Sequence, residues 1–250
     1  PFGAPGEFVQ LYFSRVCGRG SNVGSRWGGS VVAARQTLPY PMLYRGREVN
    51  TAYISGVAVT ESYRGQDIGN NLMRQAHFRL YYKDTVFASL IPAEAWLYGW
   101  YGKCGYAQVI TCKPAPADPM AGSFADFDRI QRARNCVLLH DEDGYGVIRD
   151  DIRLAGEAYK PQTEDIPAML RVIDAKKALR LYVETHPGVD MVIRVEGDAD
   201  IPMNNAYYVL KDGTVRQTDE PCQSAVKLTI DALARFIFDG EGAEMSLMLN

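Results

Sequence analysis

The stretch 57–69 constrains the fold of this chain more than any other part of the sequence. It begins as an apolar β-forming run, passes through a polar turn that contains Arg64 and Gly65, and continues with apolar residues at helical spacing from Ile68. A strand that leads through such a turn into a helix presents successive backbone N–H groups, together with the positive end of the helix dipole, at one point. The stretch therefore predicts an α/β unit whose turn is suited to bind a diphosphate.

A second motif, Trp100-Tyr101-Gly102-Lys103-Cys104-Gly105-Tyr106, follows downstream. It places the Tyr101 hydroxyl in a glycine-flanked turn, where a phenol can give a proton to a leaving group. Either motif alone is more often a plain strand-to-helix connection or a packed tyrosine. The two occur in order, separated by a predicted helix at 68–83 and a predicted buried strand at 86–90, and this arrangement is far more specific than either motif.

The rest of the chain divides at a proline-rich stretch, 113–119. Before this stretch, the pattern predicts a helix at 8–13, a hairpin-like pair of strands at 30–38 and 51–59, a short helix at 93–101 and a strand at 106–112. After it, the period predicts helices at 124–134 and 145–154 and a further helical stretch that begins at 166. The last part alternates as strands at 189–195, 206–210 and 225–230 before a helix at 232–238, which indicates an α+β module.

The composition argues against several classes of protein. The 250 residues suffice for two modest domains or one large one. A net charge of −3 gives no reason to expect a nucleic-acid partner, and no apolar run is long enough for a membrane span. The five cysteines are scattered and only three histidines are present, so we expect no metal site, reduced thiols and a cytoplasmic location.

Together the two motifs resemble the acetyl-CoA site of the GNAT N-acetyltransferases. The resemblance implies an α/β fold with a mixed sheet flanked by helices, and acetyl-CoA as the co-substrate. It also implies that a primary amine of a small-molecule acceptor attacks directly and that Tyr101 acts as general acid toward the coenzyme A sulfur. The residues that the resemblance assigns to the cofactor are Val57, Ala58, Val59, Arg64, Gly65, Gln66, Asp67, Ile68 and Gly69.

Asp67 departs from the family pattern, which has glycine at this place. A carboxylate next to a diphosphate is repulsive. Either the Asp67 side chain turns away and caps the following helix, or the cofactor site is weakened or lost. In the second case the alternative function is that of a catalytically impaired protein of this fold, which acts as a ligand- or lipid-binding module.

The chain as a whole resembles the Eis (enhanced intracellular survival) type of acetyltransferase, whose hydrophobic-Tyr-Gly-Arg-Phe-Gly-Tyr motif is close to residues 100–106. This resemblance implies a GNAT domain at 1–112, a linker with the remnant of a second GNAT-like region at 113–165, and a C-terminal α+β domain similar to sterol carrier protein 2 at 166–250. The middle part is shorter than in that group, so either this member is reduced or segments of the protein are missing from the sequence near residues 156–164.

The Eis-type resemblance also implies a homo-oligomer and a catalytic base at the C-terminus. The base would be the α-carboxylate of Asn250, provided that desolvation raises its pKa. The other interpretation of this apolar tail is an edge strand that only fills the core. Five acidic residues are either attractive to a cationic amine or plain solvated surface; they are Glu61, Glu94, Asp141, Glu142 and Asp143.

Overall fold

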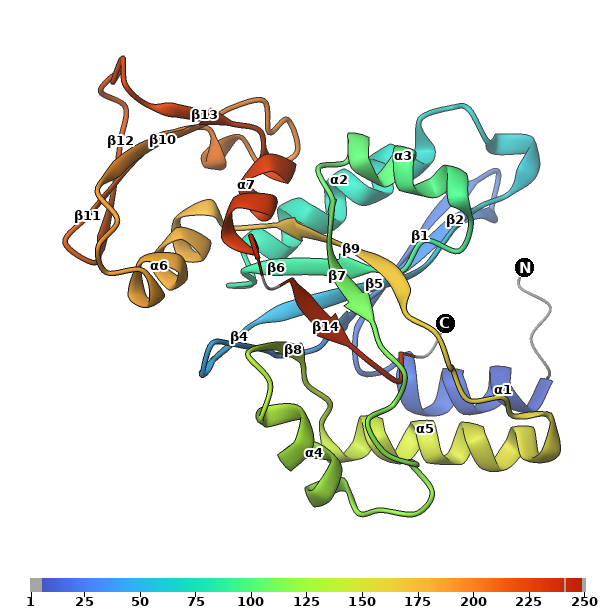
Figure 1. Ribbon diagram of the computed structural model, residues 1–250. Coiled ribbons are helices and arrows are strands. Elements are labelled where there is room, and N and C mark those ends of the chain that lie inside the picture. The colour runs from blue at the N-terminus through green and yellow to red at the C-terminus, as the bar shows by residue number, and fades with distance from the viewer. Residues whose placement is uncertain (1–5, 241, 249–250) are drawn as a thin grey trace.

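Ten strands form one large mixed sheet (Figure 1). The computed structural model describes residues 6–240 and 242–248. In spatial order the strands are β1 (Ser21–Trp27), β2 (Ser30–Pro39), β5 (Thr51–Val59), β6 (Phe87–Leu90), β9 (Ile166–Val172), β7 (Ala107–Cys112), β14 (Ala243–Met245), β8 (Cys136–Leu138), β3 (Met42–Tyr44) and β4 (Arg47–Val49). The expected mixed sheet flanked by helices is therefore confirmed.

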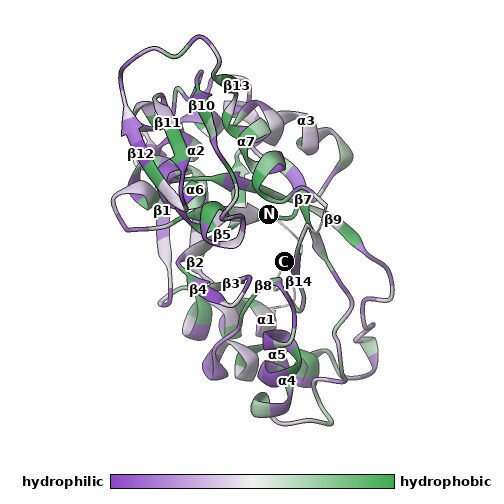
Figure 2. Ribbon diagram, turned by 60° about the vertical axis from the view of Figure 1, so that its left-hand side comes forward, coloured by the Kyte–Doolittle hydropathy of each residue, from purple (hydrophilic) through white to green (hydrophobic). Residues whose placement is uncertain are grey.

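Apart from the helical stretch predicted from Ile166, the predicted helices are present, with small differences at their ends. The helices before the second sheet are α1 (Gly6–Leu11), which continues as the π-helical turn η1 (Tyr12–Val16), α2 (Ile68–Tyr81), α3 (Ala95–Lys103), α4 (Phe124–Arg132) and α5 (Glu142–Ala155). Short 3-10 turns lie at η2 (Glu61–Tyr63), η3 (Gly156–Ala158) and η4 (Pro202–Asn204). Helices α1, α4 and α5 gather at one end of the molecule, and the second sheet lies at the other (Figures 1 and 2).

Strands β5 and β6 run parallel but stay together only over a short distance. Their pairing covers Thr51–Tyr53 of β5, whereas β5 continues alone on that side to Val59. A bulge in the pairing of β5 with β2 coincides with Gly56, whose φ of +60° a side chain would strain. The sheet therefore opens between β5 and β6, and α2 and α3 follow directly after these two strands.

Two late segments of the chain complete the same sheet. Strand β9 lies between β6 and β7 and is antiparallel to both. The helical stretch predicted from Ile166 is therefore wrong: a short apolar run does not distinguish a buried helix from a strand that is covered on both faces. Strand β14 lies between β7 and β8 as an interior strand, and residues 246–248, for which an edge strand is one of the two interpretations, are not part of a strand. Thus the range 166–250 contributes two strands to the first sheet.

The remaining C-terminal residues form the expected α+β module. Its second sheet has the order β12 (Thr214–Thr218), β11 (Tyr207–Lys211), β10 (Met191–Val195) and β13 (Val226–Leu228), and its helices are α6 (Ala175–Thr185) and α7 (Ile230–Ile237). Helix α7 packs on β7 and β9 as well as on α6, and so joins the module to the large sheet. Among the described helices, none combines the length and the apolar character that crossing a bilayer requires.

Candidate functional site

The turn between β5 and α2 leaves a row of backbone donors free. In the described chain, the five consecutive N–H groups from Gly65 to Gly69 have no hydrogen-bond acceptor. Gly65 has a φ of +76°, which a side chain would strain. The Arg64 Nε donates to the carbonyl oxygen of Val59 at 3.2 Å, and this bond ties the turn to the end of the strand. The turn thus has the form of an anion site at a helix N-terminus.

Asp67 does not cap the helix in the way that its position suggests. It stands at the N-cap of α2, but its carboxylate accepts no hydrogen bond from the helix backbone. The carboxylate instead accepts a bond from Asn70 Nδ2 at 2.6 Å. The φ of Asp67 is +61°, in the left-handed region where glycine is most at ease. The capping interpretation is therefore wrong, and the charge remains beside the free N–H groups.

Gly69 brings the two sequence motifs into contact. A Cβ placed on Gly69 would lie 3.2 Å from the Trp100 ring and 3.7 Å from the Val59 side chain. The first turn of α2 therefore lies directly against α3 and against the end of β5. Apolar side chains of α2 and α3 share one buried cluster, with Tyr101 and Tyr106 among its members. The motifs at 57–69 and 100–106 thus form one structural site.

Tyr101 is a buried phenol on α3. Its side chain is 7% exposed, and its ring lies 4.7 Å from that of Trp100 and 5.8 Å from that of Tyr106, centre to centre. Burial, together with the neighbouring Cys104 thiol, raises the pKa of Tyr101 far above its ordinary value. Tyr101 therefore keeps its proton at neutral pH and is available as a proton donor.

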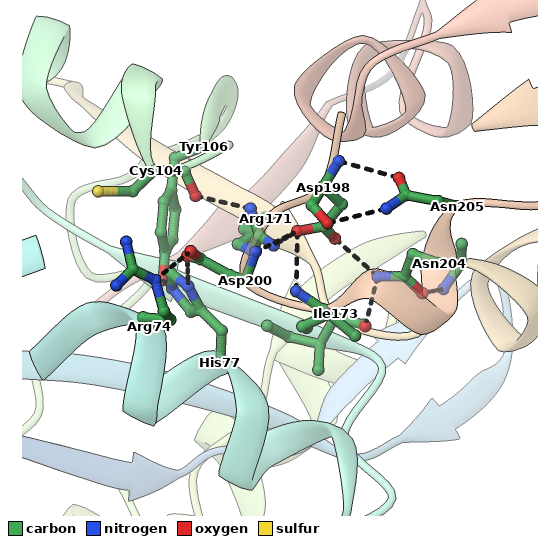
Figure 3. Close-up of polar contacts among 12 residues, drawn as sticks. Arg74, His77, Cys104, Tyr106, Arg171, Ile173, Asp198, Asp200, Asn204 and Asn205 are labelled. Carbon is green, nitrogen blue, oxygen red and sulfur yellow. Dashed lines mark hydrogen bonds and ion pairs between the residues drawn. The ribbon is translucent and has the colours of Figure 1, made fainter. Parts of the chain in front are cut away.

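A polar chain that the sequence did not reveal lies behind Tyr106 (Figure 3). The Tyr106 hydroxyl lies 3.0 Å from His77 Nε2, and His77 Nδ1 lies 2.7 Å from an Asp200 oxygen. Burial and the charge of Arg171 lower the pKa of His77 to about 4, so the ring is neutral. With Asp200 ionised, Nδ1 donates to the carboxylate and Nε2 accepts from Tyr106. A sequence separation of 123 positions between His77 and Asp200 hid this pair from sequence reasoning.

Asp200 belongs to a loop that a second buried ion pair fixes in place. Although burial alone would raise its pKa, the hydrogen bond from His77 and the charges of Arg171 and Arg74 lower it. Arg171 donates to Asp198 at 2.6 Å and to the carbonyl oxygen of Cys104 at 2.6 Å. These bonds connect β9, the loop before η4 and the second motif (Figure 3).

Gly105 of the second motif is required by this ion pair. Its φ is +83°, and a Cβ there would overlap the Arg171 guanidinium. The glycine therefore makes room for a buried side chain that approaches from β9. Gly105 could be recognised in the sequence as part of a motif, but the sequence did not indicate that Arg171 is the reason for a glycine there.

The C-terminal tail enters the sheet before the described chain ends. The Lys113 N–H donates to the carbonyl oxygen of Met245 at 2.7 Å. Ser246 is buried, with Gln131 Nε2 2.9 Å from its hydroxyl and His140 Nε2 2.8 Å from its carbonyl oxygen. The predicted base, Asn250, lies outside the described residues.

Two of the five acidic residues, which are either attractive to a cationic amine or plain solvated surface, pair with arginines. Asp141 pairs with Arg19, and Asp143 pairs with Arg15 at 2.7 Å. All five cysteines are free thiols. Within the described ranges, no three His, Cys, Asp or Glu side chains come together in a way that could hold a metal ion.

The comparisons with known proteins agree with this geometry. Residues 2–109 match the family described as acetyltransferase (GNAT) domain. No curated protein matches the chain. The matched range contains both the turn at 64–69 and the motif around Tyr101.

Solved structures extend the similarity to the whole chain. Eis1 from Mycobacterium abscessus aligns with a TM-score of 0.63 and 15% identity over 94% of this chain and 86% of that one. A GCN5-related N-acetyltransferase from Kribbella flavida aligns with a TM-score of 0.61 and 18% identity over 100% of this chain and 93% of that one. A conserved Enterococcus faecalis protein of unknown function, described as a probable N-acyltransferase, aligns with a TM-score of 0.69 and 13% identity over 93% of this chain and 83% of that one. At such identities the alignments show a shared fold. Residues 2–109 thus match the GNAT acetyltransferase domain, and the described chain shares the fold of these proteins.

Proposed function

We propose that the chain is an acetyl-CoA-dependent N-acetyltransferase. One observation carries the proposal: five consecutive free N–H groups, Gly65 to Gly69, stand at the N-terminus of α2 beside the opening between β5 and β6. Diphosphate oxygens are the acceptors that such a row of donors binds. In the described sheet, the edge of β5 from Val57 to Val59 has no strand beside it on the β6 side, so backbone groups on this edge can pair with the amides of pantetheine, apart from the Val59 carbonyl oxygen, which accepts from Arg64.

Tyr101 is the proposed general acid. Its proton is retained at neutral pH, and Trp100 and Gly69 connect its helix to the proposed diphosphate turn. An acceptor amine would attack the acetyl carbonyl directly, with the Tyr101 hydroxyl donating to the departing coenzyme A sulfur.

The C-terminal α-carboxylate of Asn250 is the proposed base. Strands β5, β6, β7 and β14 run in the same direction, so β14 ends at the edge where β5 and β6 part. Extending the chain by two residues beyond Asn250 should lower kcat without weakening the binding of acetyl-CoA.

The test combines binding with turnover. Calorimetric titration with acetyl-CoA should give saturable binding, and a panel of primary amines should release coenzyme A thiol. Tyr101→Phe should lower kcat about 100-fold and leave the acetyl-CoA Kd almost unchanged. Tyr82→Phe is the matched control, because Tyr82 is an exposed phenol at the end of α2. Equal losses in both variants would argue against Tyr101 as the acid.

If the protein does not bind acetyl-CoA at millimolar concentration, the proposal that it is an acetyltransferase is refuted. The alternative would then be favoured by one observation, the uncapped Asp67 carboxylate in the turn. In that case the function would be ligand or lipid binding through the module formed by the second sheet with α6 and α7. We propose that this module is similar to sterol carrier protein 2. We also propose that the protein is a homo-oligomer, which light scattering would test.

A further inference from the structure

A cavity of about 420 Å³ lies at the far end of α2 from the proposed cofactor turn. The α2 residues that line the cavity begin at Ala76, about 12 Å along the helix from Ile68. The cavity lies between the last turns of α2, the adjoining ends of β1 and β2, and the start of β5. Its volume is typical of a small-molecule site.

The charged side chains that line this cavity are all basic. They are Arg19, Arg35, Arg79 and Lys83, and none of the described lining residues is Asp or Glu. Arg19 is paired with Asp141, but no ion pair is formed by the other three within the described residues. Basic residues at a helix C-terminus are ordinary because they offset the helix dipole. That explanation covers Arg79 and Lys83, which lie at the end of α2, but it does not cover Arg35, which lies on β2.

Arg35 is buried without a counter-ion. Its side chain is 3% exposed, with Nε donating to the Leu72 carbonyl oxygen at 2.9 Å and Nη1 donating to the Thr37 hydroxyl at 2.6 Å. Its Nη2 has no partner in the described chain. Burial and the nearby charge of Arg79 lower the pKa of Arg35 to about 10. The other fully buried arginine, Arg171, is neutralised by Asp198, so this protein does supply a carboxylate where a guanidinium is buried permanently.

A second orphaned group lies on the same cavity. The Thr51 hydroxyl, at the start of β5, is buried and has no hydrogen-bond partner in the described chain. Buried polar groups are nearly always satisfied, and each exception requires an explanation. An anion in this cavity would be a counter-charge for Arg35, Arg79 and Lys83, and rotation of the Arg35 and Thr51 side chains toward it would give their unsatisfied groups an acceptor.

We propose that this cavity is a second ligand site, which binds a phosphate-bearing small molecule with its phosphate against Arg35, Arg79 and Lys83. Proline and aliphatic side chains complete the lining and would contact the uncharged part of the ligand; they are Pro39, Pro41, Ala76 and Leu80. The site is independent of acetyl transfer, because none of these residues belongs to the turn at 64–69 or to the Tyr101 motif.

The experiment titrates inorganic phosphate into the full chain by calorimetry, with chloride adjusted to keep the ionic strength constant. The cavity variant is Arg79→Gln/Lys83→Gln, which changes two exposed side chains and so keeps the fold. The matched control, Arg64→Gln/Arg74→Gln, removes two positive charges near the opposite end of α2. We expect 1:1 binding that is at least about tenfold weaker in the cavity variant and within about threefold of wild type in the control.

A second variant, Thr51→Val, should change thermal stability and phosphate affinity in opposite directions. Removing an unsatisfied hydroxyl should raise the thermal stability of the ligand-free protein, while phosphate affinity should fall about threefold or more. Absence of saturable phosphate binding would overturn the proposal. So would an equal loss in both double variants, or a loss confined to the control, which would assign the phosphate to the turn at 64–69. Acetyl-CoA binding, measured separately on the cavity variant, should stay unchanged and distinguishes this site from the proposed cofactor site.

Discussion

Replacement of Asp67 tests the proposed cofactor turn most directly. The Asp67 carboxylate is exposed, is held by Asn70, and lies beside five free N–H groups that would surround a diphosphate. At about 5 Å in water, the repulsion between two unit charges is about 0.8 kcal/mol. Two phosphate charges double this to about 1.6 kcal/mol, which corresponds to roughly tenfold in affinity. Asp67→Asn should therefore tighten acetyl-CoA binding about tenfold at low ionic strength.

The choice of variants separates charge from backbone strain. Asparagine tolerates the left-handed conformation of Asp67 about as well as aspartate, so Asp67→Asn changes chiefly the charge. Asp67→Gly also removes the left-handed penalty and should in addition raise stability by about 1 kcal/mol. The matched control is Asp84→Asn, because Asp84 has the same φ of +61° and lies beyond the other end of α2.

The assay is calorimetric titration with acetyl-CoA at two salt concentrations. The gain in Asp67→Asn should shrink at the higher salt, because an exposed charge is screened. An unchanged Kd in both Asp67 variants, or an equal gain in Asp84→Asn, would refute the electrostatic reasoning. If the Asp67 variants bind acetyl-CoA and the wild type does not, Asp67 prevents the binding of the cofactor. This result would support the alternative function of a ligand- or lipid-binding module.

Two further predictions concern the polar network behind the site. Gly105→Ala should destabilise the protein by about 3 kcal/mol or more. The new Cβ would displace the buried Arg171 side chain, and the alanine would have to adopt a positive φ. Gly99→Ala, in open space on α3, should be neutral or stabilising, and equal urea denaturation curves for the two variants would contradict the argument. His77 titrates at about 4 in the folded protein against 6.5 ordinarily, so its contribution is complete above pH 6.5 and is lost as the pH falls toward 4. The unfolding free energy of the wild type should fall by about 3 kcal/mol over that interval from this group. His77→Gln should flatten the fall, and parallel pH profiles would disprove the assignment.

Local patterns were enough to predict the proposed cofactor turn and the Tyr101 motif. Residues 57–69 and 100–106 each specify a strand, a turn and a helix through their own spacing and glycines, and the structure brings the two together through Gly69 and Trp100. The same local reasoning failed at Ile166, because the neighbours that make this segment a strand are β6 and β7. It also missed β1, a polar edge strand in which only every second residue is partly buried.

Long-range pairs were inaccessible for a different reason. Arg35 and Thr51 are ordinary polar residues in strand-like runs, and only the fold shows that each is buried with an unsatisfied group. His77 reads as one more residue of the predicted helix at 68–83. Its partner Asp200 comes from a loop that the sequence leaves without any pattern.

The place of β14 has a consequence for how the chain is made. Six strands of the sheet lie on one side of β14, namely β1, β2, β5, β6, β9 and β7. The other three, β8, β3 and β4, lie on its other side. Because β14 is formed by residues 243–245, the two parts of the sheet cannot join while those residues are still inside the ribosome. Until residues 243–245 have emerged, the facing edges of β7 and β8 expose unpaired backbone groups, which can pair with another chain. The complete sheet therefore depends on late pairings between segments far apart in the sequence, and such pairings are of high contact order.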